Sequence, residues 1–341
     1  MTTASPHATL ASAPELGLHP KWKTATALRK ECARTAATLT DPAAVPQQRW
    51  QSLTAYAEGG NPFADLIDPT LPRRGPLAPA VSDVLWGEPA RLARWPLAML
   101  DGAPQAQWLD DFAHEAAYAF WRWRIDSLRG APGQVLLEMP ARVLARCLYL
   151  GWMPEARSVA LALRDTYAAR RLANVAGATS QPLNHFLLRV AFDHWALAFD
   201  GWGQGHNPRQ NPALDPKDVH QRGECFGEPV LNTLAARWRD PDLDACVSHL
   251  CWLADYTTHR LSPDREFAFG GQLAAYMPGV LLPALRLREQ AGLALPALTH
   301  PLLAPPVAPL PAVQPMYTDP LLARVLARLA QEELPGLCAY A

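Results

Sequence analysis

The sequence predicts an all-α protein, an irregular helical array or bundle of packed helix hairpins with a proline-rich strap near the C-terminus. Three observations favour this fold class. Isoleucine occurs only at Ile67 and Ile125, while leucine and alanine dominate the apolar residues, a balance that favours helix over strand. Between residues 105 and 290, apolar side chains recur at steps of three and four. The 34 prolines gather at segment boundaries and in two irregular stretches, where they punctuate helices.

The composition is that of a folding chain with little net charge. Hydrophobic residues make up 49% of the 341 residues and charged residues only 18%, below the usual share of about a quarter. The chain is long enough to bury a large core, as one large domain or two ordinary ones. A net charge of −1 provides no global field to attract nucleic acid or an anionic membrane, so we expect neither as a partner.

Nothing in the sequence predicts export or a membrane anchor. Residues 1–20 lack a basic start followed by an apolar run, so no secretory signal is expected. The most apolar long stretch, Leu273 to Leu287, is interrupted by Pro278, Pro283 and Arg286 and is too short to span a bilayer. The six cysteines form neither a CxxC motif nor a disulfide framework. We therefore expect reduced thiols and a cytoplasmic location.

The first of three segments, residues 1–101, is predicted to hold N-terminal helices and a loop region. Apolar spacing indicates helices from Trp22 to about Leu39 and from about Gln47 to Ala57. Glycines and prolines then crowd residues 59–79, which we expect to form loops with short ordered pieces at most.

The second segment, residues 102–290, is the predicted main helical body. Its longest predicted helix runs from Gln105 to Leu128. Val135 to Leu150 and Pro154 to Arg171 form a predicted hairpin, because Gly151 ends the first helix and Pro154 suits the first turn of the second. The hairpin locally resembles a tetratricopeptide turn. No second copy follows at the offset of roughly 34 residues, so a regular repeat array is not expected.

Further helices are predicted in the rest of this segment and in the third segment, residues 291–341. Asp240 is expected to cap the helix that follows it, with a proline at the first helical position. A proline-rich strap from Leu295 to Pro315 leads to a last helix, Asp319 to Glu333, which Asp319 caps and which packs on the body. The remaining predicted helices are Leu183 to Phe199, Val230 to Arg239, Leu243 to His259 and Leu273 to Glu289.

An acidic cluster begins the longest predicted helix. It consists of Asp110, Asp111 and Glu115, with His114 between them. His114 and Glu115 start like the HExxH zinc motif, but Tyr118 stands where the second histidine is required. The motif therefore fails. We expect a solvated acidic first turn that complements the helix dipole.

The acidic pair also resembles, loosely, the magnesium-binding motif of all-α isoprenoid synthases. Such an enzyme would need a second run of oxygen ligands at four-residue steps. The nearest run is Asp244, Ser248 and Trp252, which ends on an indole that cannot replace an oxygen ligand. The second half of the motif is missing.

Histidine and cysteine side chains on two other helices have a simpler structural explanation. His194 lies on the apolar stripe of its helix, where we expect a buried histidine that is hydrogen-bonded to a neighbouring helix. Asp193 beside it could pair with an arginine such as Arg142 or Arg146, and a catalytic or metal role for the two residues stays open. Cys246 belongs to an apolar stripe and is expected to pack as a small hydrophobic residue.

A glycine-rich run at residues 201–205 follows a predicted helix and is itself followed by prolines. A phosphate-binding loop needs a helix that starts after it, so this run does not fit that motif. We expect a long connection from Gly201 to Gly223. Such a loop suits partner contact, and Trp202 and His206 are its candidate contact residues.

Trp121 and Trp123 alternate with Arg122 and Arg124, so one of the two rings could face outward. Exposed tryptophan and arginine are enriched in binding hot spots, which makes Trp121 a candidate contact residue. The sequence favours the alternative, in which the rings close the core and the arginines stack on them.

The C-terminal portion, Tyr276 to Leu334, carries a series of packing and turn residues over less than a fifth of the chain. They are Leu281-Leu282-Pro283-Ala284-Leu285-Arg286-Leu287-Arg288, Gly292-Leu293, Pro296, His300-Pro301-Leu302-Leu303 and the closing helix from Asp319. On these residues the chain resembles the α-helical immunity proteins of bacterial polymorphic and type VI secreted toxins. The resemblance implies a cytoplasmic protein that binds and neutralises a cognate protein toxin.

Without a complete catalytic constellation, the sequence favours binding over catalysis, and we assign no catalytic residue, metal or cofactor. The expected contact surface includes the loop at residues 201–223 and the acidic positions Asp110, Asp111 and Glu115. Two alternatives remain open. One is an all-α enzyme with a metal-binding acidic site, and the other is a helical scaffold or adaptor.

Overall fold

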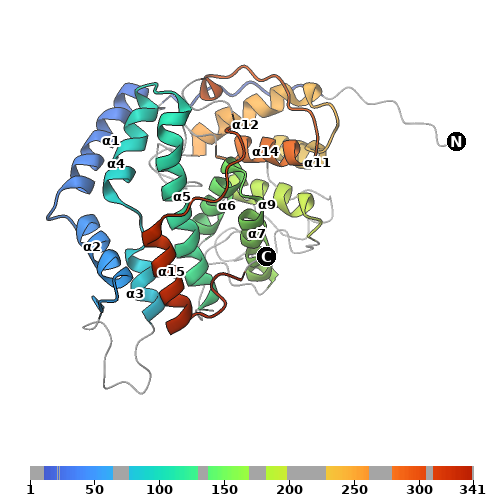
Figure 1. The fold of residues 1–341 in the computed structure, drawn as a ribbon. Coiled ribbons are helices and arrows are strands. Elements are labelled where there is room, and N and C mark those ends of the chain that lie inside the picture. Colours follow the sequence, from blue (N-terminus) through green and yellow to red (C-terminus); the bar gives the residue numbers. More distant parts are fainter. Residues whose placement is uncertain are drawn as a thin grey trace, which may run out of the picture.

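The computed structural model describes residues 11–20, 22, 24–63, 77–129, 137–168, 182–197, 228–260, 279–304 and 310–339. Within these ranges the regular structure is helical and contains no strand (Figure 1). The predicted all-α fold class is therefore confirmed.

The predicted helices are present, and two further helices, over residues 77–84 and 89–100, were not predicted. The N-terminal segment holds α1 (Ala25–Thr40), α2 (Val45–Ala57), α3 (Leu77–Val84) and α4 (Pro89–Leu100). The main body holds α5 (Gln105–Leu128), α6 (Glu138–Leu150), α7 (Met153–Ala168), α9 (Pro182–His194), α11 (Pro229–Arg237), η2 (Asp244–Cys246), α12 (Val247–Arg260) and α14 (Leu281–Gln290). The C-terminal segment holds η3 (Pro301–Leu303) and α15 (Pro320–Glu332).

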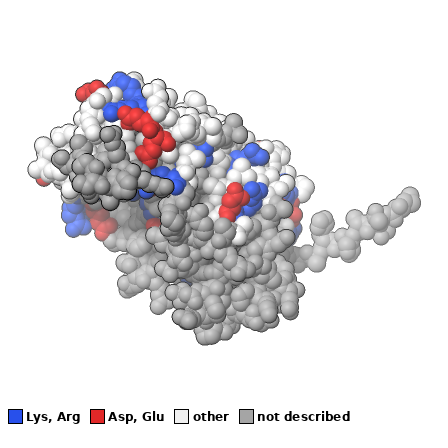
Figure 2. Space-filling model, turned by 90° about the horizontal axis from the view of Figure 1, so that it is seen from below, with Lys and Arg blue, Asp and Glu red and all other residues white. Residues whose placement is uncertain are grey.

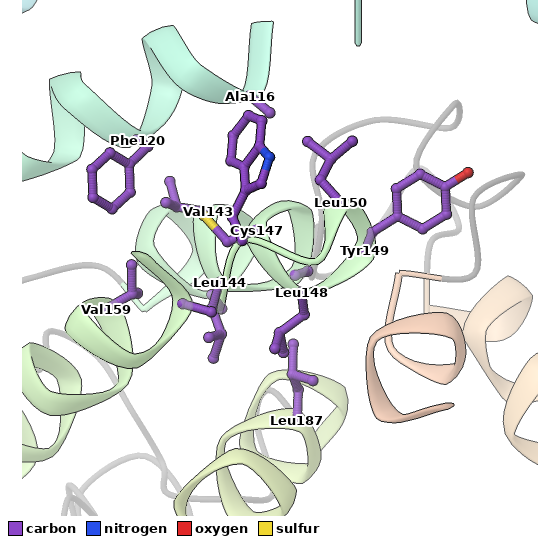
Figure 3. Packing of buried hydrophobic residues seen from close by; sticks show 14 of the residues in the cluster. Ala116, Phe120, Val143, Leu144, Cys147, Leu148, Tyr149, Leu150, Val159 and Leu187 are labelled. Atoms are coloured by element: carbon purple, nitrogen blue, oxygen red, sulfur yellow. The ribbon is translucent and has the colours of Figure 1, made fainter. Parts of the chain in front are cut away.

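Helix α6 lies at the centre of the array and packs against α5, α7, α9 and α14. Figure 3 shows Val143 and Cys147 on the side of α6 that faces α5, and Leu148 on the side that faces Leu187 of α9. Cys147 is fully buried, and burial raises the pKa of its thiol well above the usual value. Its role is that of a small apolar side chain.

The turn that ends α6 behaves as the sequence predicts. Gly151 adopts a φ of 79°, the left-handed conformation that favours glycine, and caps the helix. A Cβ at this position would lie 2.9 Å from Cγ2 of Val313 in the strap. The amide of Gln314, next to Val313, donates to the carbonyl of Leu150 at 3.3 Å. This hydrogen bond holds the strap close to the turn.

The N-terminal and C-terminal segments both pack on the main body. Residues 11–19 run along α12, where Ala13 N donates to Ser248 Oγ at 3.1 Å and His19 N to Thr258 Oγ1 at 2.9 Å. Helix α15 lies beside α2 and α3 in Figure 1 and contacts α2. Its N-cap is Asp319, whose carboxylate accepts from Leu322 N at 2.8 Å, as predicted. Buried residues of all three segments form one hydrophobic cluster.

Two local predictions are wrong. Helix α4 was not expected, because Pro89 and Pro96 hide its apolar spacing; Pro89 occupies the first turn, where its missing N–H costs nothing. Asp240 does not cap the next helix. Its carboxylate accepts from Arg237 Nε at 2.6 Å, and the chain instead makes the 3-10 turn η2 before α12 begins at Val247.

Helix α14 is buried along almost its whole length, and two of its buried side chains are arginines. Arg286 and Arg288 are each 1% exposed. Arg286 donates to the carbonyl oxygens of Tyr149, at the end of α6, and of Pro311 in the strap. Arg288 donates to the carbonyl oxygens of Trp238, Asp240 and Ala294. One helix therefore ties together the ends of α6 and α11 and the strap.

We predict that Arg286→Ala lowers the free energy of unfolding by about 3 kcal/mol, because it leaves buried carbonyl groups without donors. The control is Arg324→Ala, since Arg324 is an exposed arginine on α15. Urea unfolding at pH 7, followed by circular dichroism, measures both variants. Equal stability of the two variants would contradict the role given to Arg286.

Candidate functional site

A cavity of about 250 Å³ lies between α5 and α6. We call it the arginine pocket, because three of its lining side chains are arginines. Helices α1 and α4 and the α3–α4 turn close its sides. The lining residues are Leu39, Leu85, Trp86, Leu92, Glu115, Ala119, Arg122, Met139, Arg142, Val143 and Arg146.

Helical periodicity brings the charged side chains of the pocket together. Helix α5 contributes Glu115 and Arg122, seven residues apart, and α6 contributes Arg142 and Arg146, four apart. These spacings place each pair on one face of its helix. Since α5 packs on α6, the two charged faces meet at the cavity.

The three arginines differ in how their donors are used. Arg146 Nη2 donates to Glu115 Oε1 at 2.7 Å, and Arg142 Nη2 donates to Glu138 Oε1 at 2.6 Å. Among the described residues, Arg122 makes no hydrogen bond or ion pair. The Nε atoms of both Arg122 and Arg142 are buried without an acceptor in this part of the chain. The pocket therefore contains unused charged donors.

Burial disfavours the charged form of two of these side chains. It lowers the pKa of Arg122, although the charges of Asp126 and Asp83 oppose the shift. Burial also lowers the pKa of Arg142, and the positive charge of Arg146 adds to that effect. Because an arginine stays protonated at neutral pH even so, the pocket keeps a positive charge that its own side chains only partly neutralise.

Trp86 forms the rim of the pocket and is 44% exposed. The guanidinium carbon of Arg122 lies 3.9 Å from the centroid of its ring, and that of Arg49 lies 5.4 Å from it. The indole N–H donates to Asp83 O at 2.7 Å. The ring is thus held in place at the surface by one hydrogen bond and two cation–π contacts.

The acidic cluster lies next to the pocket and is not the solvated turn that the sequence predicts. Asp111 is only 4% exposed, and its carboxylate accepts from Arg91 Nε at 2.6 Å and from Arg94 Nε at 2.5 Å. Asp110 is exposed and pairs with Arg91. Glu115 accepts from Trp95 Nε1 and from Arg146, each at 2.7 Å. The expectation fails because α4, which was not predicted, supplies the arginines.

His114 has a structural role within this cluster. The ring is 1% exposed, and its Nε2 accepts a hydrogen bond from Glu88 N at 2.8 Å. Its Nδ1 lies 3.6 Å from Oδ2 of Asp319, the N-cap of α15. A Cβ on Gly87, whose φ is +99°, would lie 2.9 Å from Nε2 of His114. Since the backbone N–H occupies Nε2, this nitrogen is not free to act as a base or a ligand.

The carboxylates of the cluster are stabilised in their ionised form. Burial alone would raise the pKa of Asp111, but the hydrogen bonds and charges of Arg94 and Arg91 outweigh it and lower the pKa. Burial alone would also raise the pKa of Asp319. Its polar contacts with His114, Leu322 N and Tyr118 outweigh burial and lower this pKa. In the described part of the chain, no three His, Cys, Asp or Glu side chains are grouped so that they could hold a metal ion.

The predicted site residues outside the acidic cluster are either buried or lie outside the described residues. Trp121 and Trp123 are 8% and 7% exposed, so neither ring faces outward, and Arg122 stacks on Trp86 rather than on them. Trp202 and His206 lie outside the described residues, as does the whole loop at residues 201–223.

Asp193 does not pair with Arg142 or Arg146, contrary to the prediction. Its carboxylate accepts from Trp238 Nε1 at 2.8 Å and from Arg239 Nε at 2.5 Å. His194 is half-buried against the ring of Trp238, and burial lowers its pKa. Cys246 is fully buried, as expected.

The arginine pocket was missed at the level of the sequence, although a signal existed. Arg142 and Arg146 are four residues apart on one helix, where like charges repel each other. Two arginines at this spacing would destabilise the helix unless a negatively charged group lay near the helix face that carries them. The sequence does not reveal that Trp86 lies at the rim, because its position depends on α3 and α4.

Comparison with protein-family models, with curated proteins and with solved structures gives no match for this chain. Over the residues that the structure describes, no helix has the length and apolarity needed to cross a membrane. Figure 2 shows basic and acidic side chains near one another among other residues on the described part of the face it displays.

We predict that Asp111→Asn lowers the free energy of unfolding at pH 7 by about 3 kcal/mol, because it removes the charge of a buried carboxylate that accepts from both Arg91 and Arg94. The control is Asp110→Asn, which removes an exposed partner of the same Arg91 and is expected to cost less than about 1 kcal/mol. Urea unfolding measures both values.

The same carboxylates predict how stability depends on pH. Because the pKa values of Asp111 and Asp319 are lowered on folding, their contribution is fully present above the unfolded pKa of about 4 and is lost as the pH falls through the folded values. Wild-type protein should lose more stability between about pH 5 and pH 3 than Asp111→Asn does. Parallel pH profiles would contradict the assignment.

Proposed function

We propose that this chain is a cytoplasmic immunity protein, which binds a cognate secreted bacterial toxin and neutralises it without catalysis. The observation that carries the proposal is Trp86, a large aromatic side chain that is 44% exposed and lies against Arg49 and Arg122. Tryptophan and arginine dominate the binding energy of protein interfaces. A ring that is already held in place loses little conformational entropy when a partner covers it.

The side chains with catalytic character support binding rather than an enzyme. Asp111 is engaged by two arginines, and His114 accepts a backbone hydrogen bond. Magnesium would have to displace both guanidinium groups from Asp111 before this carboxylate could act as a ligand. The isoprenoid-synthase alternative therefore receives no support from the acidic cluster. A scaffold or adaptor would use the same kind of surface as an immunity protein, and the identity of its partner separates the two.

The contact surface that we propose differs in part from the one expected from the sequence. Among the acidic candidates, Asp110 remains at the surface, with a side chain that is 74% exposed. Asp111 and Trp121 are buried, and Glu115 is bound to Arg146 and Trp95. Trp86 and Arg49 therefore replace them as the first residues to test.

The test begins with capture of the partner. Tagged chain is used as bait in lysate of the native bacterium, and the protein that stays bound in equal amount is identified by mass spectrometry. The captured protein is then expressed in a sensitive host with and without this chain. The proposal predicts that it arrests growth alone and is harmless in the presence of this chain. A captured protein without toxicity would favour the adaptor instead.

Trp86→Ala tests the surface itself. We expect it to weaken binding of the captured toxin by about 30-fold, equivalent to about 2 kcal/mol at a hot spot. Leu295→Ala is the matched control, because Leu295 is also 44% exposed but lies in the C-terminal strap. Calorimetric titration compares the two variants. Equal affinities for Trp86→Ala and wild-type protein would remove Trp86 from the interface.

A further inference from the structure

We infer that the arginine pocket is a binding site for one organic anion, a carboxylate or phosphate group carried on a small apolar body. This inference goes beyond the proposed function, because it assigns a ligand to the cavity beneath Trp86. It does not depend on that function, since the isolated chain is sufficient to test it.

The donors of the pocket support an anionic ligand. Each guanidinium group carries five N–H donors. Within the described residues Arg122 uses none of them in a hydrogen bond, and only its Nε is buried, so its two NH2 groups are accessible to a ligand. An oxyanion offers two or three acceptor oxygens in the geometry that a guanidinium group matches best.

The balance of charge points in the same direction. Three arginines face one glutamate in the lining of the cavity. Glu115 is already bound to Arg146, and Glu138, which pairs with Arg142, lies outside the lining. Arg122 is therefore the arginine of the lining that makes no ion pair in the part of the chain that is described, although the charges of Asp126 and Asp83 act on it from a longer distance. A single negative group between Arg122 and Arg142 would relieve the repulsion among the three cations.

The remaining walls indicate what the anion is attached to. Apolar side chains make up the rest of the lining, and three of them, Leu39, Leu92 and Met139, are partly exposed. The indole of Trp86 closes the rim. A hydrated inorganic ion would leave these walls in contact with water, whereas an aliphatic or aromatic group would cover them. At about 250 Å³ the cavity is slightly smaller than usual ligand pockets, so the body is small.

The shared chemistry has two sources, a free small molecule and an acidic side chain of a protein partner. Phenyl phosphate and phenylacetate serve as probes of the first source. The peptide acetyl-Leu-Glu-Leu-amide serves as a probe of the second. Phenylacetamide and the corresponding Gln peptide are the uncharged controls, which keep the shape and remove the charge.

Isothermal titration of the full chain at constant ionic strength tests the inference. We expect saturable one-to-one binding of at least one charged probe and no binding of its uncharged control. Preference for phenyl phosphate or phenylacetate would identify a free metabolite as the source, and preference for the Glu peptide would identify a partner side chain. Failure of all three charged probes to bind would overturn the inference.

Two variants test the residues. Arg122→Gln should lower the affinity for the bound probe by at least about tenfold, the loss expected for one charge-assisted hydrogen bond. Arg324→Gln should change its affinity less than about threefold, because Arg324 is an exposed arginine on α15 that does not line the cavity. Urea unfolding checks that both variants fold. Equal losses in the two variants would overturn the assignment, because a general effect of surface charge would explain them.

Discussion

The structure depends above all on the burial of two arginines on one helix. A guanidinium group cannot be removed from water unless its N–H donors find acceptors. Apart from Nε of Arg286, which has no partner in the described part of the chain, Arg286 and Arg288 find them in carbonyl groups at the ends of α6 and α11 and in the strap, and Arg286 also pairs with Glu289. The carbonyls of Tyr149 and Trp238 are of the kind that a helix end leaves without an internal partner. The hydrogen bonds to these carbonyl groups offset the cost of burying the two charges. They also bring three separate parts of the chain together at α14.

The acidic cluster follows a similar principle at the other side of the array. Asp111, His114 and Asp319 are residue types that suggest chemistry, yet each is engaged in holding helices together. Asp111 joins α5 to α4, and His114 joins α5 to the turn before α4 and to the cap of α15. The arginine pocket differs from this cluster because its cations outnumber their partners. The contrast between satisfied and unsatisfied charges distinguishes a structural cluster from a candidate binding site.

Features that depend on neighbouring residues in the chain could be predicted from the sequence, and features that depend on distant residues could not. The bounds of α5, the glycine that ends α6 and the capping by Asp319 follow from spacing and from local hydrogen bonding. The environment of Asp111 could not be foreseen, because its partners belong to α4, whose prolines mask its helical pattern. The pocket was missed for a related reason. It forms only when faces of α5 and α6 meet the turn that carries Trp86.

The pairing of the first and last parts of the chain has a consequence for biosynthesis. Tyr56 of α2 donates to Glu332 of α15, a contact that spans 276 residues. Tyr56 and its neighbour Leu53 are completely buried in the finished protein. Since α15 is translated long after α2, the core around α2 closes only late in synthesis. Apolar surface on the N-terminal helices therefore stays exposed until α15 has been made, because contacts of such long range cannot form earlier. A chaperone that shields this surface would raise the yield of folded protein more than one that acts on the middle of the chain.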